Sequence, residues 1–213
     1  MRIGVLGSGA VGTTLGAGFL AHGHEVMVAS RQPEKLRDWL RQNGGARIGT
    51  PEESAKFAEV AVLAAKGAAA AAMLRAAGAA NLAGKPLIDT TNPIADAPPV
   101  NGLLQFFTTL DDSLMERLQK EFPQIHFVKA FNSVGAPRMV DPVYAAGRPT
   151  MFICGDDQPA KAVVTLLLDQ LGWDSEDMGG VEAARAIEPL CMLWCIPGFR
   201  HNQWTHAFKL LKS

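Results

Sequence analysis

Three glycines near the beginning of the chain have the spacing of a turn that binds phosphate. They lie in Gly7-Ser8-Gly9-Ala10-Val11-Gly12, which follows the apolar residues 3–6 and leads into a helix-like segment. The first glycine of such a motif permits a tight turn from strand to helix, the second lets a pyrophosphate approach the backbone, and the third lets the helix pack on the strand. Free N–H groups at the helix N-terminus bind the anion. The alternative is a glycine-rich turn that packs closely without a ligand, but the setting between strand and helix favours a dinucleotide site.

A second group of residues indicates which dinucleotide binds. About twenty residues beyond the glycines, an NAD site carries an acidic residue for the ribose 2′-hydroxyl. This chain has Ser30-Arg31 there. Arg31 can form a charge-assisted fork on a 2′-phosphate, the Ser30 hydroxyl can donate a hydrogen bond, and Lys35 can add positive charge. These residues predict NADP as the cofactor, and the alternative is that they are ordinary solvated charges at the start of a helix.

The sequence offers no familiar set of catalytic side chains. We find no Ser-His-Asp arrangement, no paired carboxylates and no zinc spacing. Cys191 and Cys195 lie one helical turn apart, with His201 and His206 downstream, but their apolar neighbours suit small buried thiols better than metal ligands. We therefore expect no catalytic side chain and no metal site.

The elements that would position these residues alternate along the chain. Strands are predicted at residues 3–6, 24–29, 58–63, 86–89, 126–132 and 150–154. Helices are predicted directly after the glycine turn, from residue 51, within 181–196, and at 33–42, 68–80, 114–122 and 159–171. Two capping boxes, Thr50 with Glu53 and Ser113 with Glu116, mark helix starts. This alternation predicts an α/β fold with a doubly wound parallel sheet of the Rossmann type.

Length and composition limit the organisation of the protein. Its 213 residues suffice for one Rossmann domain, expected over residues 1–178, and a small C-terminal helical extension over 179–213 that closes the acceptor site or forms a dimer interface. The net charge of −1 argues against nucleic acid, and no long apolar run suggests a membrane span. If Met1 is the native start, there is no room for a signal segment, and we expect a cytoplasmic protein with reduced cysteines.

Several segments together resemble one family, the small NADPH-dependent oxidoreductases typified by the reductase of the deazaflavin coenzyme F420. The matching segments are residues 7–12, residues 30–31 with Lys35, and residues 128–132, 154–157 and 179–190. The last two are the most specific, because a generic Rossmann protein has no reason to carry them. The chain is also similar to the oxidoreductase domain of the six-transmembrane metalloreductases, which use NADPH as well. The resemblance implies hydride transfer between NADP(H) and a small-molecule acceptor such as coenzyme F420 or another flavin.

The same resemblance implies roles for individual residues. Ser8 would contact phosphate, and Ser30, Arg31 and Lys35 would hold the 2′-phosphate. Further cofactor contacts would come from Ala64, Ala65 and Lys66 beside the adenosine ribose, and from Asn92, Pro93, Asn132 and Ala136 around the nicotinamide. Residues 89–93 also follow a predicted strand, at the sheet edge where parallel strands meet a ligand. This loop and Lys66 look unlike the deazaflavin reductases, which leaves the acceptor open.

Two other functions are compatible with these residues. A dehydrogenase or reductase of a small carbonyl or imine needs a Lys or Tyr as proton donor, and Lys129-x-x-Asn132 superficially supplies the Lys and Asn of such a site. Residues three apart on a strand point to opposite faces, so this pair acts together only if the strand ends by Phe131. An NADPH-sensing module without turnover would carry the same cofactor motifs.

The C-terminal part of the chain is apolar. Residues Ala184, Ile187, Cys191 and Trp194 have the spacing of one helical face. Met192, Leu193, Trp194 and Ile196 are weak candidates for the acceptor wall, and their alternative role is that of helix core. Together with residues 204–211, this helix predicts a homodimer.

Overall fold

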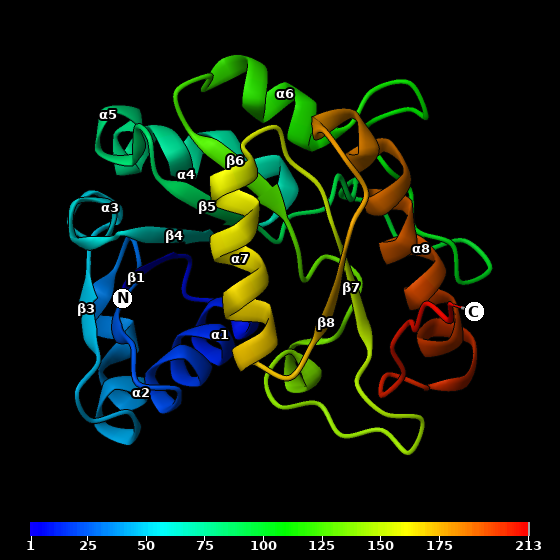
Figure 1. Cartoon of the computed structure of the whole chain (residues 1–213), viewed down its shortest axis with the longest axis horizontal. Helices are drawn as coiled ribbons and strands as arrows, with labels where there is room; N and C mark the ends of the chain where they lie inside the picture. Colours follow the sequence, from blue (N-terminus) through cyan, green and yellow to red (C-terminus); the bar gives the residue numbers. More distant parts are fainter. Residues whose placement is uncertain (213) are drawn as a thin grey trace.

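A six-stranded parallel sheet forms the centre of the computed structural model, which describes residues 1–212. In spatial order its strands are β3 (Arg47–Gly49), β2 (Glu25–Ala29), β1 (Arg2–Leu6), β4 (Val60–Leu63), β5 (Pro86–Asp89) and β6 (His126–Lys129). The chain runs from β1 outward to β3, and then returns to the centre and continues from β4 to the opposite edge (Figure 1). The predicted doubly wound fold is confirmed. In such a sheet the ligand crevice lies where the strand order reverses, here at the carboxyl ends of β1 and β4.

Helices cover both faces of the sheet. Helices α1 (Ala10–Ala21) and α7 (Gln158–Gln170) pack on one face, and α3 (Pro51–Phe57), α4 (Ala70–Ala77) and α6 (Leu114–Glu121) pack on the other. The further helical elements are α2 (Arg37–Gln42), α5 (Ala79–Leu82), α8 (Ala184–His201), η1 (Pro33–Leu36), η2 (Gly67–Ala69), η3 (Ala136–Arg138) and η4 (Val181–Ala183). The capping boxes at Thr50 and Ser113 are present at the starts of α3 and α6, as predicted.

Alternate residues of the central strands supply the two layers of the core. Val5 of β1 and Val62 of β4 belong to the cluster beneath α1 and α7, whereas Leu6 and Leu63 belong to the cluster on the opposite face. All four side chains are fully buried. Parallel strands that are covered on both faces are continuous apolar runs in the sequence, which is why these strands could be predicted.

Several expected elements are shorter than predicted or broken. The strand expected at 126–132 ends at Lys129, and Phe131 has a left-handed φ of 60° that ends the extended conformation. The helix expected at 68–80 is divided into η2, α4 and α5, and the φ of 78° at Gly78 separates α4 from α5. The helix expected at 33–42 begins as the 3-10 helix η1 before α2.

Two strands lie outside the main sheet. Strand β7 (Thr150–Ile153) was predicted, but it pairs in parallel with β8 (Asp174–Asp177) and not with β6. Its connection to the main sheet is an isolated antiparallel bridge between Cys154 and Lys129. The strand-helix alternation in this part of the chain therefore builds a second small sheet and does not extend the first.

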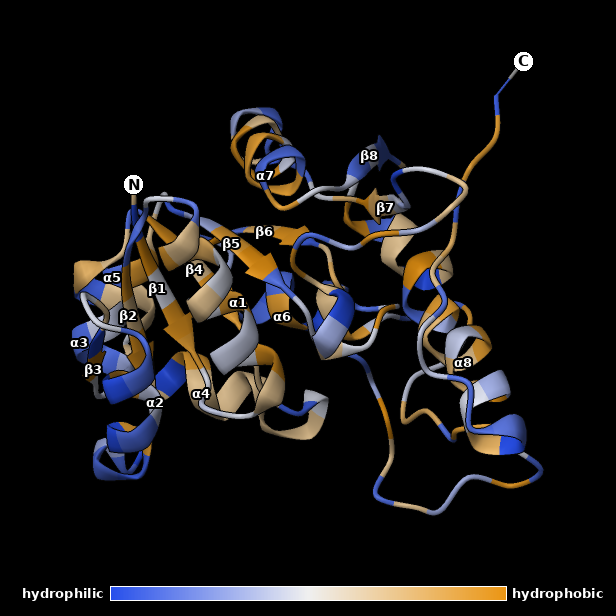
Figure 2. Ribbon diagram, turned by 90° about the horizontal axis from the view of Figure 1, so that it is seen from below, coloured by the Kyte–Doolittle hydropathy of each residue, from blue (hydrophilic) through white to orange (hydrophobic). Residues whose placement is uncertain are grey.

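The C-terminal helix and a long connection form the end of the molecule beyond β6 (Figure 2). Helix α8 buries the predicted face at Ala184, Ile187, Cys191 and Trp194, and it continues beyond residue 196 to His201. The connection 93–113, between β5 and α6, folds back on itself through a bridge between Ile94 and Phe106. Leu104 and Phe106 pack on the cluster of Cys191, Trp194 and Cys195. The domain boundary at residue 178 stays a prediction.

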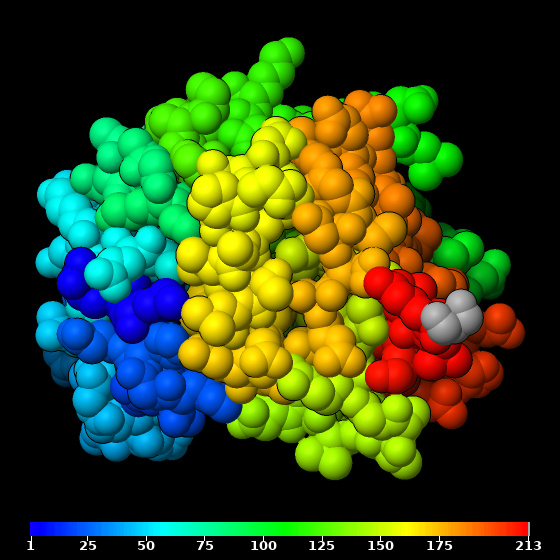
Figure 3. Space-filling view, viewed as in Figure 1, coloured from blue at the N-terminus to red at the C-terminus, as the bar shows by residue number. Residues whose placement is uncertain are grey.

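The surface seen in Figure 3 shows how these parts adjoin. Helix α7, in yellow, separates the N-terminal strands and helices from α8, in orange. Within residues 1–212, none of the helices combines the length and the apolar character needed to cross a lipid bilayer.

Candidate active site

A cavity of about 830 Å³ lies at the carboxyl ends of β1, β4 and β5. Residues 9–11, 64–68, 90–92 and 94–98 line it. The first two segments are the turns after β1 and β4, so the cavity occupies the point where the strand order reverses. Among the described residues, the charged side chains in this lining are Lys66 and Asp96.

The glycine turn has the shape that the sequence predicts. A Cβ atom on Gly7 would lie 2.1 Å from the carbonyl oxygen of Ala64, and one on Gly12 would lie 2.1 Å from the carbonyl oxygen of Gly7. Both contacts are far too short, so these two positions require glycine for packing alone. A Cβ atom on Gly9 would meet no protein atom within 4 Å. The space beside Gly9 is therefore open for a ligand.

The N-terminus of α1 fits the pyrophosphate of a dinucleotide. The first N–H groups of a helix have no partner within it, and no side chain caps α1 at Gly9. The first turn of α1 carries no acidic residue that would repel an anion. Backbone donors, a helix dipole and open space thus coincide at residues 9–12.

Two serines connect the glycine turn with the end of β2. The Ser8 hydroxyl donates a hydrogen bond to Oγ of Ser30 over 3.2 Å, and the backbone N–H of Gln32 donates to the same oxygen over 3.1 Å. Ser30 is buried, and its Oγ is an acceptor in both contacts. The hydroxyl proton of Ser30 therefore remains available for a phosphate oxygen.

Arg31 and Lys35 lie next to Ser30 in sequence and are exposed. Neither takes part in the ion pairs formed within residues 1–212, although other basic residues nearby, such as Arg41 and Arg47, do. The positive charges of Arg31 and Lys35, which form no ion pair among residues 1–212, therefore lie just after β2. The residues predicted to hold a 2′-phosphate lie close together in the sequence, just after β2 and outside the cavity lining.

The opposite side of the cavity is formed by the loop after β5. The hydroxyls of Thr90 and Thr91 both donate inward, to the carbonyl of Leu63 over 2.9 Å and to Oδ1 of Asp89 over 2.7 Å. Asn92 donates to the carbonyl of Asn132 over 2.8 Å, and Asn132 Nδ2 donates back to Asn92 Oδ1 over 3.2 Å. The protons of both threonine hydroxyls are thus already engaged by the protein.

The structure brings together some of the predicted cofactor residues in the cavity lining and places others outside it. Its lining includes Gly9, Ala10, Val11, Ala64, Ala65, Lys66 and Asn92. The other residues predicted to contact the cofactor lie outside this lining: Gly7, Ser8, Gly12, Ser30, Arg31, Lys35, Pro93, Asn132 and Ala136. Asn132 is buried behind Asn92, and Ala136 begins η3. The four candidates for an acceptor wall on α8 also lie outside the cavity lining.

Sequence reasoning missed several residues of the cavity wall. Thr90 and Thr91 belong to the loop that was predicted to face the nicotinamide but were not assigned as contacts. Residues 94–98 come from an irregular connection without a periodic pattern. The signal that could have identified the threonines is their position directly after a strand that ends at the crevice.

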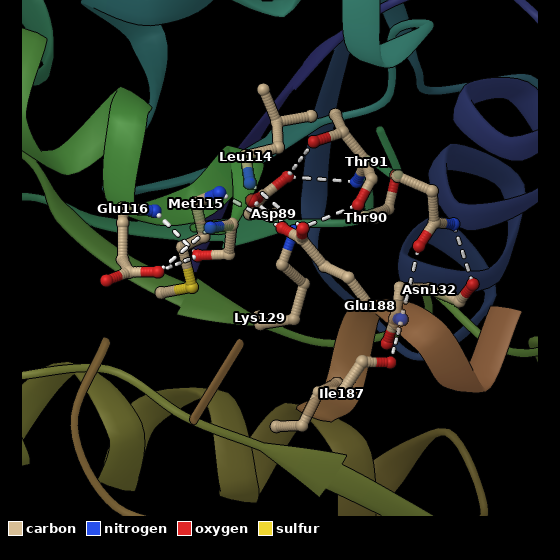
Figure 4. A network of polar contacts seen from close by, with 12 residues as sticks. Asp89, Thr90, Thr91, Leu114, Met115, Glu116, Lys129, Asn132, Ile187 and Glu188 are labelled. Carbon is tan, nitrogen blue, oxygen red and sulfur yellow. Dashed lines mark hydrogen bonds and ion pairs between the residues drawn. The ribbon is translucent and has the colours of Figure 1, made fainter. Parts of the chain in front are cut away.

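Lys129 has no access to the cavity. Its side chain is fully buried, and its Nζ atom lies 2.7 Å from Asp89 Oδ2 and 2.9 Å from Glu188 Oε1 (Figure 4). Burial alone would lower the pKa of Lys129, but the charges of Asp89 and Glu188 outweigh this effect and raise the pKa above its ordinary value. Although the strand ends before Phe131, Lys129 and Asn132 hold the loop at residues 91 and 92 from behind and lie outside the cavity lining.

The cysteines are buried thiols and are not linked in disulfides. Burial raises the pKa of the Cys154 thiol to about 12, so this group stays protonated at neutral pH. Within residues 1–212, no group of three or more His, Cys, Asp or Glu side chains could hold a metal ion.

Comparison with known proteins places this geometry in a family. Residues 2–93 match the family described as "NADP oxidoreductase coenzyme F420-dependent". Over its whole length the chain is 35% identical to a candidate F420-dependent NADP reductase from Arthrobacter sp. FB24, with a TM-score of 0.93 over the whole of that structure.

A second relative matches the sequence of this chain within a longer protein. Over 206 residues the chain is 30% identical to the metalloreductase STEAP3 of Rattus norvegicus, covering 92% of this chain and 38% of that protein. The chain thus spans well under half of the metalloreductase. A reductive aminase from Aspergillus terreus in complex with NADPH4 is 20% identical, with a TM-score of 0.67 over 93% of this chain and 61% of that one, which shows a shared fold.

The family match, the full-length likeness to the Arthrobacter protein and the geometry of the glycine turn agree with one another. The chain belongs to the coenzyme F420-dependent NADP oxidoreductases, a family of NADP-dependent enzymes.

Proposed function

We propose that this protein transfers a hydride between NADP(H) and a flavin-like acceptor such as coenzyme F420. The observation that carries this proposal is a cavity that adjoins the glycine turn and, among residues 1–212, is lined by no buried ionisable side chain. In the part of the chain that the structure describes, the ionisable side chains lining it are Lys66, which is exposed, and Asp96, which is exposed. Such a site suits an acceptor whose reduction needs positioning more than acid-base catalysis.

Different residues of the chain would hold different parts of the cofactor. The N–H groups at residues 9–12 would bind the pyrophosphate, and Ser30, Arg31 and Lys35 would bind the 2′-phosphate. Bound NADPH supplies the hydride. The alanines at 64, 65 and 68 give the cavity an apolar wall against which the reacting rings would pack, and Asn92 borders the same space.

The geometry disfavours the alternative function, a carbonyl or imine reductase in which Lys129 is the proton donor. The Lys129 ammonium has no exposed surface and is held between two carboxylates. Its raised pKa opposes proton release, and its Nζ donates to the carbonyl of Thr91 over 2.9 Å on the far side of the loop from the cavity. An acceptor that needs a proton from the enzyme would require a donor other than Lys129.

An acceptor panel tests this function. The purified protein is mixed with NADPH and, in separate reactions, with coenzyme F420, riboflavin, a ferric chelate, a quinone, and a small ketone with an amine. Loss of the reduced-nicotinamide absorbance is followed in each. The ferric chelate is included because of the likeness to a metalloreductase. Arg31→Asp serves as the matched control, because it should slow every reaction that depends on NADPH.

The expected result is turnover with coenzyme F420 or another flavin. Turnover restricted to the ketone and amine would contradict the proposal and support the alternative reductase. Binding of NADPH without turnover of any acceptor would support a sensing module.

We further propose that the protein acts as a cytoplasmic homodimer. The support for the dimer is apolar surface on the outer side of α8, where the side chains of Leu193 and Phe199 are 54% and 44% exposed. Light scattering coupled to size-exclusion chromatography tests the dimer, and a monomer at micromolar concentration would contradict it.

A further inference from the structure

One buried group of charges contacts the residues that flank the connection 93–113, which are Thr91 before it and Leu114 and Met115 after it. This connection supplies residues 94–98 of the cavity wall, begins just after Thr91 and Asn92, and ends at α6. The charged group consists of Asp89 at the end of β5, Lys129 at the end of β6, and Glu188 on α8. The register of the sheet places Asp89 beside Lys129.

At its first end, the connection is held through Thr91. The Nζ atom of Lys129 donates to the carbonyl of Thr91 over 2.9 Å. Oδ1 of Asp89 accepts hydrogen bonds from the backbone N–H of Thr91 over 2.9 Å and from its hydroxyl over 2.7 Å. Three hydrogen bonds to charged groups thus fix one residue, Thr91, at the cavity wall, and such bonds are stronger and more directional than neutral ones.

At its second end, the connection is held through the start of α6. Glu188 accepts hydrogen bonds from the backbone N–H groups of Leu114 over 2.9 Å and Met115 over 3.0 Å (Figure 4). A carboxylate is stabilised at this position by the helix dipole. The same carboxylate lies 2.9 Å from Lys129, so the ammonium connects the two ends of the segment.

We propose that Lys129 is a positioning residue that fixes the two ends of the connection 93–113, so that the acceptor side of the cavity keeps a single geometry. This inference rests on the proposed function, because it assigns the wall at residues 94–98 to the acceptor. A fully buried ion pair adds little stability over apolar side chains of the same volume. What the charges supply here is a set of directed contacts that apolar side chains cannot make.

Two variants and a matched control test the inference in the full chain. Glu188→Gln keeps the volume of the side chain and one acceptor oxygen, and Lys129→Met removes the ammonium. The control is Lys161→Met, because Lys161 is also buried and pairs with Asp177, yet its polar partners, Asp177 and Gly179, lie outside the cavity. If Lys129→Met fails to fold, Glu188→Gln carries the test.

The first measurement is hydrogen–deuterium exchange of the connection. The backbone N–H groups of Ala95 and Phe107 donate to the carbonyls of Gln105 and Pro93 and report on its order. We expect their exchange to accelerate by roughly tenfold or more in Glu188→Gln and Lys129→Met, as for the loss of one charged hydrogen bond. In Lys161→Met it should change no more than exchange elsewhere in the protein.

The second measurement separates the two ends of the cofactor site. We expect the KM for riboflavin to rise in Glu188→Gln, while the Kd for 2′,5′-ADP, a probe of the adenosine end, stays within about twofold of wild type. A merely structural role would lower the fraction of folded, active protein and leave both constants near their wild-type values.

The inference is overturned if the connection exchanges in Glu188→Gln and Lys129→Met as it does in Lys161→Met. This outcome is independent of the proposed function, which fails instead if the wild-type protein turns over no flavin. The exchange measurement needs no turnover, so the two failures are distinguishable.

Discussion

The hydroxyl of Ser8 donates a hydrogen bond to Oγ of Ser30 over 3.2 Å, across the gap between the glycine turn and the end of β2. The two loops that would hold the pyrophosphate and the 2′-phosphate are therefore connected before any cofactor binds. This contact leaves the proton of Ser30 free and holds its oxygen in place. Such preorganisation lowers the entropy lost on binding.

Replacement of Ser30 tests this contact. Ser30→Ala removes a hydroxyl that would donate to a phosphate oxygen, and a hydrogen bond to a charged group contributes about 1.5 to 3 kcal/mol. We expect the Kd for NADPH to rise by on the order of tenfold or more, and the Kd for NADH to change little. Fluorescence titration with both cofactors measures the difference. An equal loss of affinity for both would show that Ser30 supports the loop without contacting the phosphate.

Two glycines of the same turn should respond differently to alanine. Gly12→Ala places a Cβ atom 2.1 Å from a carbonyl oxygen, so we expect the free energy of unfolding to fall by about 1 to 3 kcal/mol. Gly9→Ala meets open space and should leave stability unchanged, but its methyl group enters the space that a pyrophosphate needs. Urea unfolding and NADPH titration of both variants separate packing from binding. A Gly9→Ala variant with wild-type affinity would exclude pyrophosphate at this position.

The ion pair between Glu116 and Arg185 should make stability depend on acid pH. Arg185 on α8 lies 2.6 Å from Oε1 of Glu116 on α6, and its hydrogen bonds hold the pKa of Glu116 below the ordinary value. A carboxylate with a lowered folded pKa stabilises the protein above its unfolded pKa of about 4.3, and this contribution is lost as pH falls through the folded value. We expect Glu116→Gln to be less stable than wild type at pH 7 and to show a shallower loss of stability below pH ~4.3.

Thermal unfolding from pH 3 to pH 7 measures this difference. Glu52→Gln is the control, because Glu52 pairs with Lys56 while both side chains are more than half exposed. Such surface pairs contribute little. Parallel pH curves for wild type and Glu116→Gln would contradict the assignment.

Local sequence signals were enough to predict the glycine turn and the strands beside it. The glycine motif, with Gly7, Gly9 and Gly12, spans only six residues. The apolar runs of β1 and β4 can be recognised as strands because burial on both faces makes every residue apolar. Ser30 and Arg31 could be placed because they directly follow a strand of the sheet. These parts of the site depend on short-range patterns.

The rest of the structure depends on contacts between distant residues. Strand β8 is acidic and partly exposed, and it becomes a strand through its pairing with β7. Lys129 meets Glu188 because α8 packs against α6 beside the end of β6, which no spacing within the sequence indicates. The cavity wall at residues 94–98 comes from an irregular connection whose path is set by its packing on α8.

Positive charge at the end of β2 is proposed to select the phosphorylated cofactor. Isothermal titration calorimetry of wild type and Arg31→Asp with NADPH and NADH tests it most directly. We predict that wild type prefers NADPH, and that Arg31→Asp weakens NADPH binding by about 2 to 4 kcal/mol, through loss of a charged hydrogen-bonding partner and added repulsion. The affinity for NADH should stay near that of wild type. Equal affinity of the wild-type protein for both cofactors, or unchanged NADPH binding in the variant, would contradict the claim.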